Sequence, residues 1–163
     1  MRNPGSPVER ESLHSRRVVE VTWGDCDASG MVFYPRYYQW FDACTHIMLS
    51  AVGLDHHELR RAYGVIGASL VEASARFRAP ATYGEALTVD SRVTRVSERS
   101  FTVGHTITVG ERLVVEGQEV RVWAARASEA IAELRAIPIP LDVRAILEGE
   151  RARAVAPNGG QSP

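Results

Sequence analysis

Apolar side chains follow a helical spacing in one part of this chain and an extended alternation in the rest. Over residues 35–52 they recur every three and four positions on most sides, with few polar side chains between them. This pattern predicts a long helix that is buried on more than one side. Pro35 suits its first turn, and Gly53 suits its C-terminal end. A short second helix is expected over residues 55–63.

The extended segments lie on both sides of this helix. Residues 16–23 are rich in β-branched and aromatic side chains and predict a first strand. After Gly64, further strands are predicted over residues 65–78, 86–96, 101–109 and 113–127, and residues 141–147 predict a last short helix. The links between these strands are short, which implies antiparallel hairpins. The expected fold is α+β: an antiparallel five-stranded sheet wrapped around one long central helix.

The bulk composition is that of one ordinary globular domain. The chain has 163 residues, of which 45% are hydrophobic and 24% charged. We expect the domain to span residues 16–150, with disordered segments over residues 1–15 and 151–163. The formal net charge of -1 gives no general attraction to nucleic acid or to an anionic membrane.

Several classes of protein are disfavoured by what the sequence does not contain. No apolar run approaches the roughly 20 residues that cross a bilayer, and the first residues do not resemble a signal peptide. Two cysteines are too few for a disulfide framework, so the cytoplasm is the expected location. The histidines have no metal-ligand spacing, and neither a metal nor another cofactor is expected.

The candidate chemistry lies between the first strand and the long helix. Asp25 and Asp27 stand in a turn rich in Gly and Ser, and the helix opens soon afterwards at Pro35. A carboxylate that faces the free amide groups of a helix N-terminus suits chemistry on a carbonyl group. Asp27 would serve there as nucleophile or general base, whereas an Asx-turn or a helix cap is the structural alternative. Asp25 either stabilises the turn or raises the pKa of Asp27 by its charge.

This segment and the order of elements over residues 16–143 resemble the 4-hydroxybenzoyl-CoA thioesterase family of the hot-dog fold. The residues that carry the resemblance are Gly24-Asp25-Cys26-Asp27, Gly30, Val32, Tyr34-Pro35, Tyr37, Trp40 and Asp42. Other members of the wider family carry a His where this chain has Tyr34, which favours the aromatic-acyl branch. The resemblance implies hydrolysis of benzoyl-CoA or hydroxybenzoyl-CoA to the free acid and CoA, in aromatic degradation. It assigns catalysis to Asp27, and the backbone N–H of Tyr34 is the expected oxyanion donor.

The same resemblance suggests how substrate and subunits are bound. It implies that Asp42 reaches the ring hydroxyl of the substrate; the alternative is that Asp42 pairs with an Arg or a backbone amide at a subunit contact. Trp40 and Phe33, with Tyr37 and Phe77, either line an aromatic pocket or belong to the core. The resemblance also implies that two chains pair their sheets edge to edge and that two such dimers form a tetramer. The active site would then lie between subunits.

The phosphates of CoA are expected to meet basic side chains. The family places such residues near the link over residues 95–100, which here offers Arg95 and Arg99, while Glu98 departs from the pattern. Further candidates are Arg76, Arg78 and Arg126. Three other functions stay open: a thioesterase for short or branched aliphatic acyl-CoA, a hydratase, and a protein that binds acyl-CoA or acyl-carrier protein without catalysis. A hydratase usually needs a His in the turn, and this turn has none.

Overall fold

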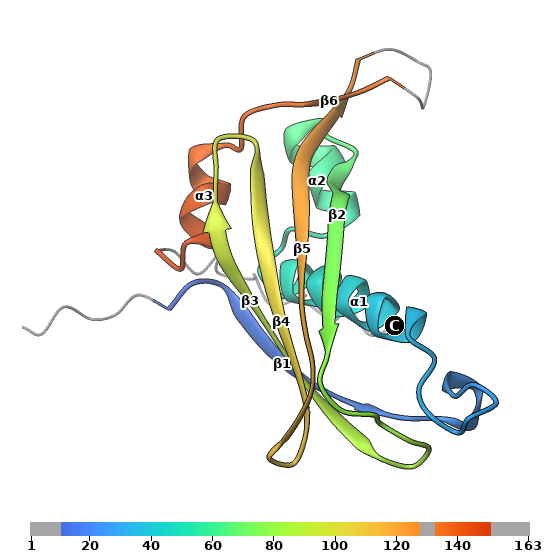
Figure 1. The fold of residues 1–163 in the computed structure, drawn as a ribbon. Helices are drawn as coiled ribbons and strands as arrows, with labels where there is room; N and C mark the ends of the chain where they lie inside the picture. The colour runs from blue at the N-terminus through green and yellow to red at the C-terminus, as the bar shows by residue number, and fades with distance from the viewer. Residues whose placement is uncertain (1–10, 128–132, 151–163) are drawn as a thin grey trace, which may run out of the picture.

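The computed structural model describes residues 11–127 and 133–150, which form one antiparallel sheet with helices on one side (Figure 1). The strands are β1 (His14–Glu20), β2 (Gly67–Phe77), β3 (Ala86–Val96), β4 (Ser100–Val109), β5 (Arg112–Arg126) and β6 (Leu134–Ala136). Their order in the sheet is β1-β3-β4-β5-β2, and β6 pairs with the end of β5. The β3–β4 and β4–β5 hairpins expected from the short links are present, because these strands pair in sequence order. The hairpin expected across residues 80–84 is wrong, because β2 pairs with β5 at the far edge of the sheet and does not pair with β3.

The helices are α1 (Pro35–Ala51), α2 (His56–Tyr63) and α3 (Leu141–Leu147), and a short 3-10 helix, η1 (Trp23–Asp25), precedes α1. The expected α+β architecture is confirmed, and α1 crosses the face of the sheet as the central helix (Figure 1). Two details differ from expectation: β1 begins at His14, and the short strand β6 was not expected. The rest of the two segments expected to be disordered, residues 1–10 and 151–163, lies outside the described residues.

Local sequence signals explain where the helices begin and end. Pro35 occupies the first turn of α1, where its missing N–H removes no helical hydrogen bond. Asp55 caps α2, because its carboxylate accepts the N–H groups of His57 and Glu58 at 2.9 and 3.0 Å. Gly64 ends α2 with φ 64°, a left-handed conformation that glycine adopts without steric cost.

Helix α1 is covered by the sheet on one side only. Its buried side chains are Tyr37, Phe41, Cys44, Thr45, Met48 and Leu49. Phe41 lies against the backbone of β5 at Gly117, where an added Cβ would overlap the Phe41 ring. Ala43 and Ile47 on the opposite side are exposed, so burial on more than one side is wrong for a single chain. The sheet of one chain has only one face to offer the helix.

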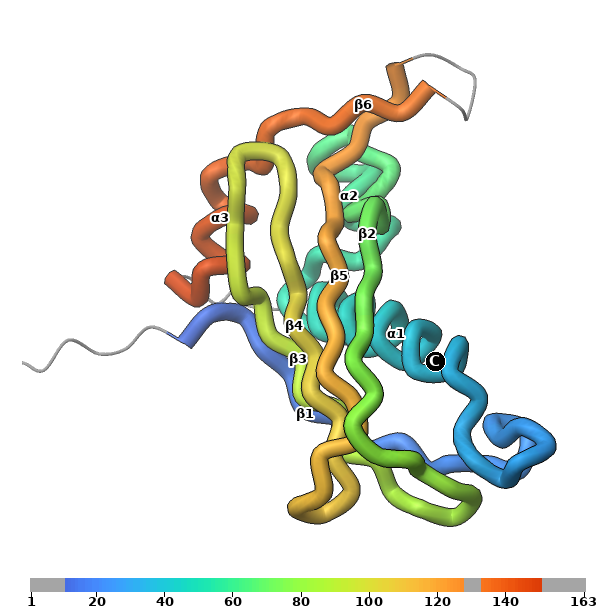
Figure 2. Tube along the Cα trace, in the orientation of Figure 1, coloured from blue at the N-terminus to red at the C-terminus, as the bar shows by residue number. Residues whose placement is uncertain are grey.

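Two clusters of buried side chains divide the core along α1. Figure 2 traces the path of α1 across the sheet, with α2 and α3 beyond it. The first half of α1 packs with Leu87, Val89, Ile107 and Val115 of β3, β4 and β5. The second half packs with α2, α3 and the far end of the sheet around Trp123. The first turn of α1 is therefore held firmly against the sheet, which fixes the position of the preceding turn. No helix within residues 11–127 and 133–150 is long and apolar enough to cross a membrane.

Candidate active site

Asp25 stabilises the backbone that leads into the site. Its Oδ2 atom accepts hydrogen bonds from the N–H and Oγ1 of Thr22, at 2.8 and 2.6 Å. Its Oδ1 atom lies 3.4 Å from Nε of Arg36, and Arg36 also donates to the carbonyl of Gly24 at 2.9 Å. Both carboxylate oxygens are thus engaged in contacts that stabilise the turn, as expected for the structural role of Asp25.

Asp27 combines a structural contact with a free carboxylate oxygen. Its Oδ1 atom accepts the N–H of Ser29 at 2.8 Å and the Ser29 hydroxyl, which makes an Asx-turn. These two hydrogen bonds from Ser29 lower the pKa of Asp27 below its ordinary 3.8, so the carboxylate is ionised at neutral pH. The alternative in which Asp25 raises the pKa of Asp27 is therefore wrong. The backbone N–H of Met31 contributes weakly to the same lowering of the pKa, and no other hydrogen bond to Oδ2 is present within the part of the chain that the structure describes.

A pocket of about 450 Å³ opens beside Asp27, between the turn, the start of α1 and the end of β2. It is lined by Asp27, Met31, Val32, Phe33, Tyr34, Tyr37, Phe77, Arg78, Ala79 and Pro80. Phe77 stands edge-on to Tyr34, with ring centroids 6.4 Å apart, and lies 5.7 Å from Tyr37. Burial and the charge of Glu85 raise the pKa of Tyr37 to about 12, so its phenol stays neutral. A flat aromatic group fits such walls.

Tyr34 lines the same pocket at the start of α1, and its backbone N–H donates to no described residue. The N–H of Phe33 donates to Asp25 O at 2.8 Å, and the N–H of Arg36 donates to Phe33 O at 2.9 Å. Between them, the N–H of Tyr34 has no acceptor within the described residues. Tyr34 is the N-cap of α1, where the helix dipole favours negative charge. One pocket therefore contains an ionised carboxylate and is adjoined by a free backbone donor, the pair that acyl transfer requires.

The profile of the thioesterase-like superfamily matches residues 21–147 of the chain. The chain belongs to this superfamily. The 4-hydroxybenzoyl-CoA thioesterase of Pseudomonas sp. (strain CBS-3) is 31% identical over 128 residues, which are 75% of this chain and 89% of that protein. Its solved structure gives a TM-score of 0.75 at 29% identity and covers 83% of this chain and 99% of that chain. The structure of a gentisyl-coenzyme A thioesterase gives a TM-score of 0.69 at 33% identity and covers 80% of this chain and 99% of that chain. The family, the hot-dog fold and the enzyme class are thereby confirmed.

Three further candidate residues of this thioesterase, on or just before α1, lie in three different places. Phe33 lines the pocket of Asp27, whereas Trp40 packs edge-on against Tyr37 at 5.4 Å and joins the edge of the core. Asp42 is half-exposed on α1 and does not line that pocket. Its Oδ1 atom lies 2.6 Å from Nη2 of Arg121, so it pairs with an Arg of its own chain.

Arg95 and Arg99 lie far from Asp27 within one chain. The β3–β4 turn that carries Arg99 is at the opposite end of the sheet from the turn of Asp27 (Figure 1). Two hydrogen bonds hold it there: Ile139 N–H to Glu98 O at 2.8 Å, and Arg144 Nη2 to Ser97 O at 2.6 Å. Of the arginines considered from the sequence, Arg78 is the one that lines the pocket of this thioesterase.

A buried ionic network under α1 was missed by sequence reasoning. Glu119 and Arg121 of β5 are only 1% and 2% exposed, and Arg121 donates to Glu119 at 3.0 and 3.2 Å. Thr45 of α1 donates to Glu119 at 2.7 Å, and Nε2 of His105 lies 3.4 Å from the same carboxylate oxygen. Burial alone would raise the pKa of Glu119, but hydrogen bonds from His105, Arg121 and Thr45 lower it to about 2.

The alternation of inward-facing and outward-facing residues along β5 was the sequence signal that could have revealed this network. Residues 115, 117, 119, 121 and 123 share the face that packs on α1, and the first and last of them are apolar. Glu119 and Arg121 therefore occupy core positions in the sequence pattern, where a charge needs a partner. Their partners on α1 are more than 70 positions away in the chain, at Asp42 and Thr45, so no local motif reveals them.

Proposed function

We propose that this thioesterase hydrolyses an aromatic acyl-CoA thioester, of the benzoyl or hydroxybenzoyl class, to the free acid and CoA. The observation that carries the proposal is the pairing of the free Oδ2 of Asp27 with the unpaired N–H of Tyr34 at one aromatic pocket. The relatives support the substrate class, because they are a 4-hydroxybenzoyl-CoA thioesterase and a gentisyl-coenzyme A thioesterase. Both names describe hydroxylated aromatic acyl groups.

The proposed reaction uses Asp27 against the thioester carbonyl. In one route Oδ2 attacks the carbonyl carbon, the C–S bond breaks, CoA leaves as a thiolate that takes a proton, and water hydrolyses the resulting anhydride. In the other route Asp27 takes a proton from the water that attacks. Both routes develop charge on the carbonyl oxygen, which the Tyr34 N–H stabilises by roughly 3–4 kcal/mol. A single turnover in water labelled with heavy oxygen places label in Asp27 only by the anhydride route, when water attacks the carboxyl carbon of Asp27. Trapping of the acyl-enzyme detects that route when water attacks the acyl carbon instead.

We also propose that the enzyme acts as a cytoplasmic homo-oligomer, a tetramer built from dimers. Strand β2 is an edge of the sheet, and its side chains Leu70, Val71 and Phe77 are 47%, 58% and 49% exposed. An apolar, unpaired edge favours pairing with a second copy. The exposed side of α1, with Ile47, offers a further apolar surface for association.

Pairing of this kind would give Asp42 its place at the substrate. Arg121, which holds Asp42, also donates to Ala68 O at 3.2 Å, so Asp42 lies beside the beginning of β2. The pocket of Asp27 lies at the other end of β2, at Phe77. Two copies paired antiparallel along β2 would bring the beginning of one strand beside the end of the other. Asp42 from a second copy would then face the pocket and accept a hydrogen bond from a ring hydroxyl.

The test is a thiol-release assay on purified protein with 4-hydroxybenzoyl-CoA, benzoyl-CoA and butyryl-CoA. We expect fastest release from the aromatic thioesters, and near-complete loss of turnover in Asp27→Asn with an unchanged melting temperature. Asp90→Asn is a matched control, because Asp90 is an exposed carboxylate on β3 that pairs with Arg16 at 2.7 Å. Preference for butyryl-CoA would contradict the aromatic class. Binding without thiol release, or full turnover by Asp27→Asn, would contradict the mechanism.

A further inference from the structure

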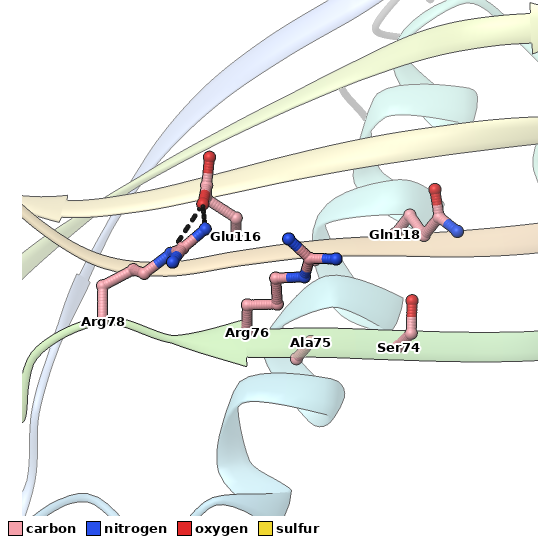
Figure 3. A pocket seen from close by; sticks show the side chains of 7 residues that line it. Ser74, Ala75, Arg76, Arg78, Glu116 and Gln118 are labelled. Carbon is pink, nitrogen blue, oxygen red and sulfur yellow. Dashed lines mark hydrogen bonds and ion pairs between the residues drawn. The ribbon is translucent and has the colours of Figure 1, made fainter.

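A second pocket, of about 500 Å³, lies on the face of the sheet that points away from α1 (Figure 3). Its lining residues are Ser74, Ala75, Arg76, Arg78, Glu116, Gly117 and Gln118. On β2, Ser74 and Arg76 alternate with Ala75 and Phe77, and Phe77 contacts Tyr37 of α1. The polar side chains therefore stand on the outer face. We call this cavity the outer pocket.

The outer pocket contains a guanidinium group without a partner. Glu116 is directly opposite Arg76 in the β2–β5 register, but its carboxylate is bound by Arg78 at 2.8 and 2.9 Å. Arg76 consequently makes no ion pair with any described residue. In Figure 3 its guanidinium lies between the Arg78–Glu116 pair and the side-chain amide of Gln118, and no dashed line reaches it.

The charge and donors of the outer pocket suit a phosphate group. Two guanidinium groups, Arg76 and Arg78, against the single carboxylate of Glu116 leave a net charge of +1. The planar fork of Arg76 is free to bind a phosphate with two parallel hydrogen bonds. The Ser74 hydroxyl and the Gln118 amide supply further donors at the same wall.

The outer pocket and the pocket of Asp27 share one lining residue, Arg78. Arg78 lines both cavities, because it follows the last residue of β2 at the rim between the two faces of the sheet. From Arg78 to Ser74 a strand spans about 13 Å, at roughly 3.3 Å per residue. An acyl-CoA carries its phosphates on a long flexible arm beyond the thioester. A thioester held at Asp27 can therefore extend that arm over the rim into the outer pocket.

We propose that the outer pocket binds a phosphate group of the CoA moiety, with Arg76 as its principal ligand. This inference rests on the proposed function, since CoA is the substrate portion concerned. Within one chain Arg95 and Arg99 lie at the opposite end of the sheet, so Arg76 is the nearer ligand. Arg95 and Arg99 of a second copy paired along β2 are the rival ligands, and the variant R95Q/R99Q tests them. Arg78 contributes indirectly, because its ion pair with Glu116 leaves the guanidinium of Arg76 free to bind the phosphate.

The proposal is tested by calorimetry with two probes, free CoA and pantetheine, which lacks the phosphates. Wild-type protein should bind CoA at least tenfold more tightly than pantetheine, and Arg76→Gln should remove about tenfold or more of the affinity for CoA alone. Arg76→Lys should recover part of this affinity, because a point charge replaces a bidentate fork. Arg16→Gln is the control for loss of an exposed, outer-face arginine.

Kinetics on two thioesters of one acyl group complete the test. Arg76→Gln should raise KM for the CoA thioester and leave kcat/KM unchanged for the N-acetylcysteamine thioester, which has no phosphate. The inference is overturned if Arg76→Gln matches wild type with both probes, or if the paired variant R95Q/R99Q is the one that loses CoA affinity. If wild-type protein hydrolyses neither thioester, the proposed function fails, and the calorimetry still decides the phosphate site.

Discussion

Replacement of Arg121 by Met tests whether the buried network beneath α1 stabilises the fold. The change removes a guanidinium that is 2% exposed and that donates to Glu119, Asp42 and the carbonyl of Ala68. Met fills a similar volume, so the main effect is electrostatic. Glu119 keeps its contacts with Thr45 and His105 but loses the guanidinium that neutralises it in the buried site.

The expected magnitude follows from the burial of both partners. Breaking a buried ion pair by removal of one member costs about 3–5 kcal/mol, because the other charge stays desolvated. For a chain of this size each kcal/mol lowers the melting temperature by roughly 2–4 °C, so Arg121→Met should melt about 6–20 °C lower. The matched control is Arg16→Met, whose exposed pair with Asp90 should contribute less than about 1 kcal/mol.

The assay is urea denaturation followed by circular dichroism, with Arg121→Met, Glu119→Gln and the double variant. This double-mutant cycle should give a coupling energy of about 0.5–3 kcal/mol between the side chains of Arg121 and Glu119.

The pH dependence of stability gives a second test. The folded-state pKa of Glu119, about 2, lies below its ordinary 4.5, so the stability that Glu119 contributes is present above pH 4.5 and is lost as pH falls toward 2. The difference in unfolding free energy between wild type and Arg121→Met should therefore decrease as pH falls from 4.5 toward 2. If Arg121→Met lost no more unfolding free energy than Arg16→Met at neutral pH, the stabilising role of the network would be refuted.

Two further predictions concern the turn and the core. Ser29→Ala removes the hydroxyl that lowers the pKa of Asp27, so the acid limb of kcat/KM should move to higher pH, toward the ordinary 3.8; an unshifted profile in steady-state assays would contradict the role of Ser29. Gly117→Ala places a methyl group into the Phe41 ring and should lower the unfolding free energy by about 1–3 kcal/mol in urea titrations. Equal stability of Gly117→Ala and wild type would show that α1 packs less closely on β5.

Much of the architecture could be predicted because its causes are local. The spacing of apolar residues indicates a helix at α1, and two of the three short links form the expected antiparallel hairpins. The third link, over residues 80–84, instead connects β2 and β3, which do not pair. The turn of Asp27 could also be found, since Gly, Ser and Asp at these positions are turn residues and the helix opens at Pro35. The short strand β6 escaped prediction because three residues carry too little pattern.

The grouping of side chains into sites was decided by the tertiary structure. From the sequence, Phe77 is either a pocket or a core aromatic and Arg78 is one of several basic candidates. The fold decides between these roles, because β2 ends beside the start of α1 and so brings both residues to the pocket of Asp27. The same is true of Arg121 with Asp42, which the wrapping of the sheet brings to 2.6 Å across 79 positions. Sequence patterns report forces between near neighbours. Contacts between distant segments depend instead on how the sheet curves over the helix, and that geometry exists only once the chain has folded.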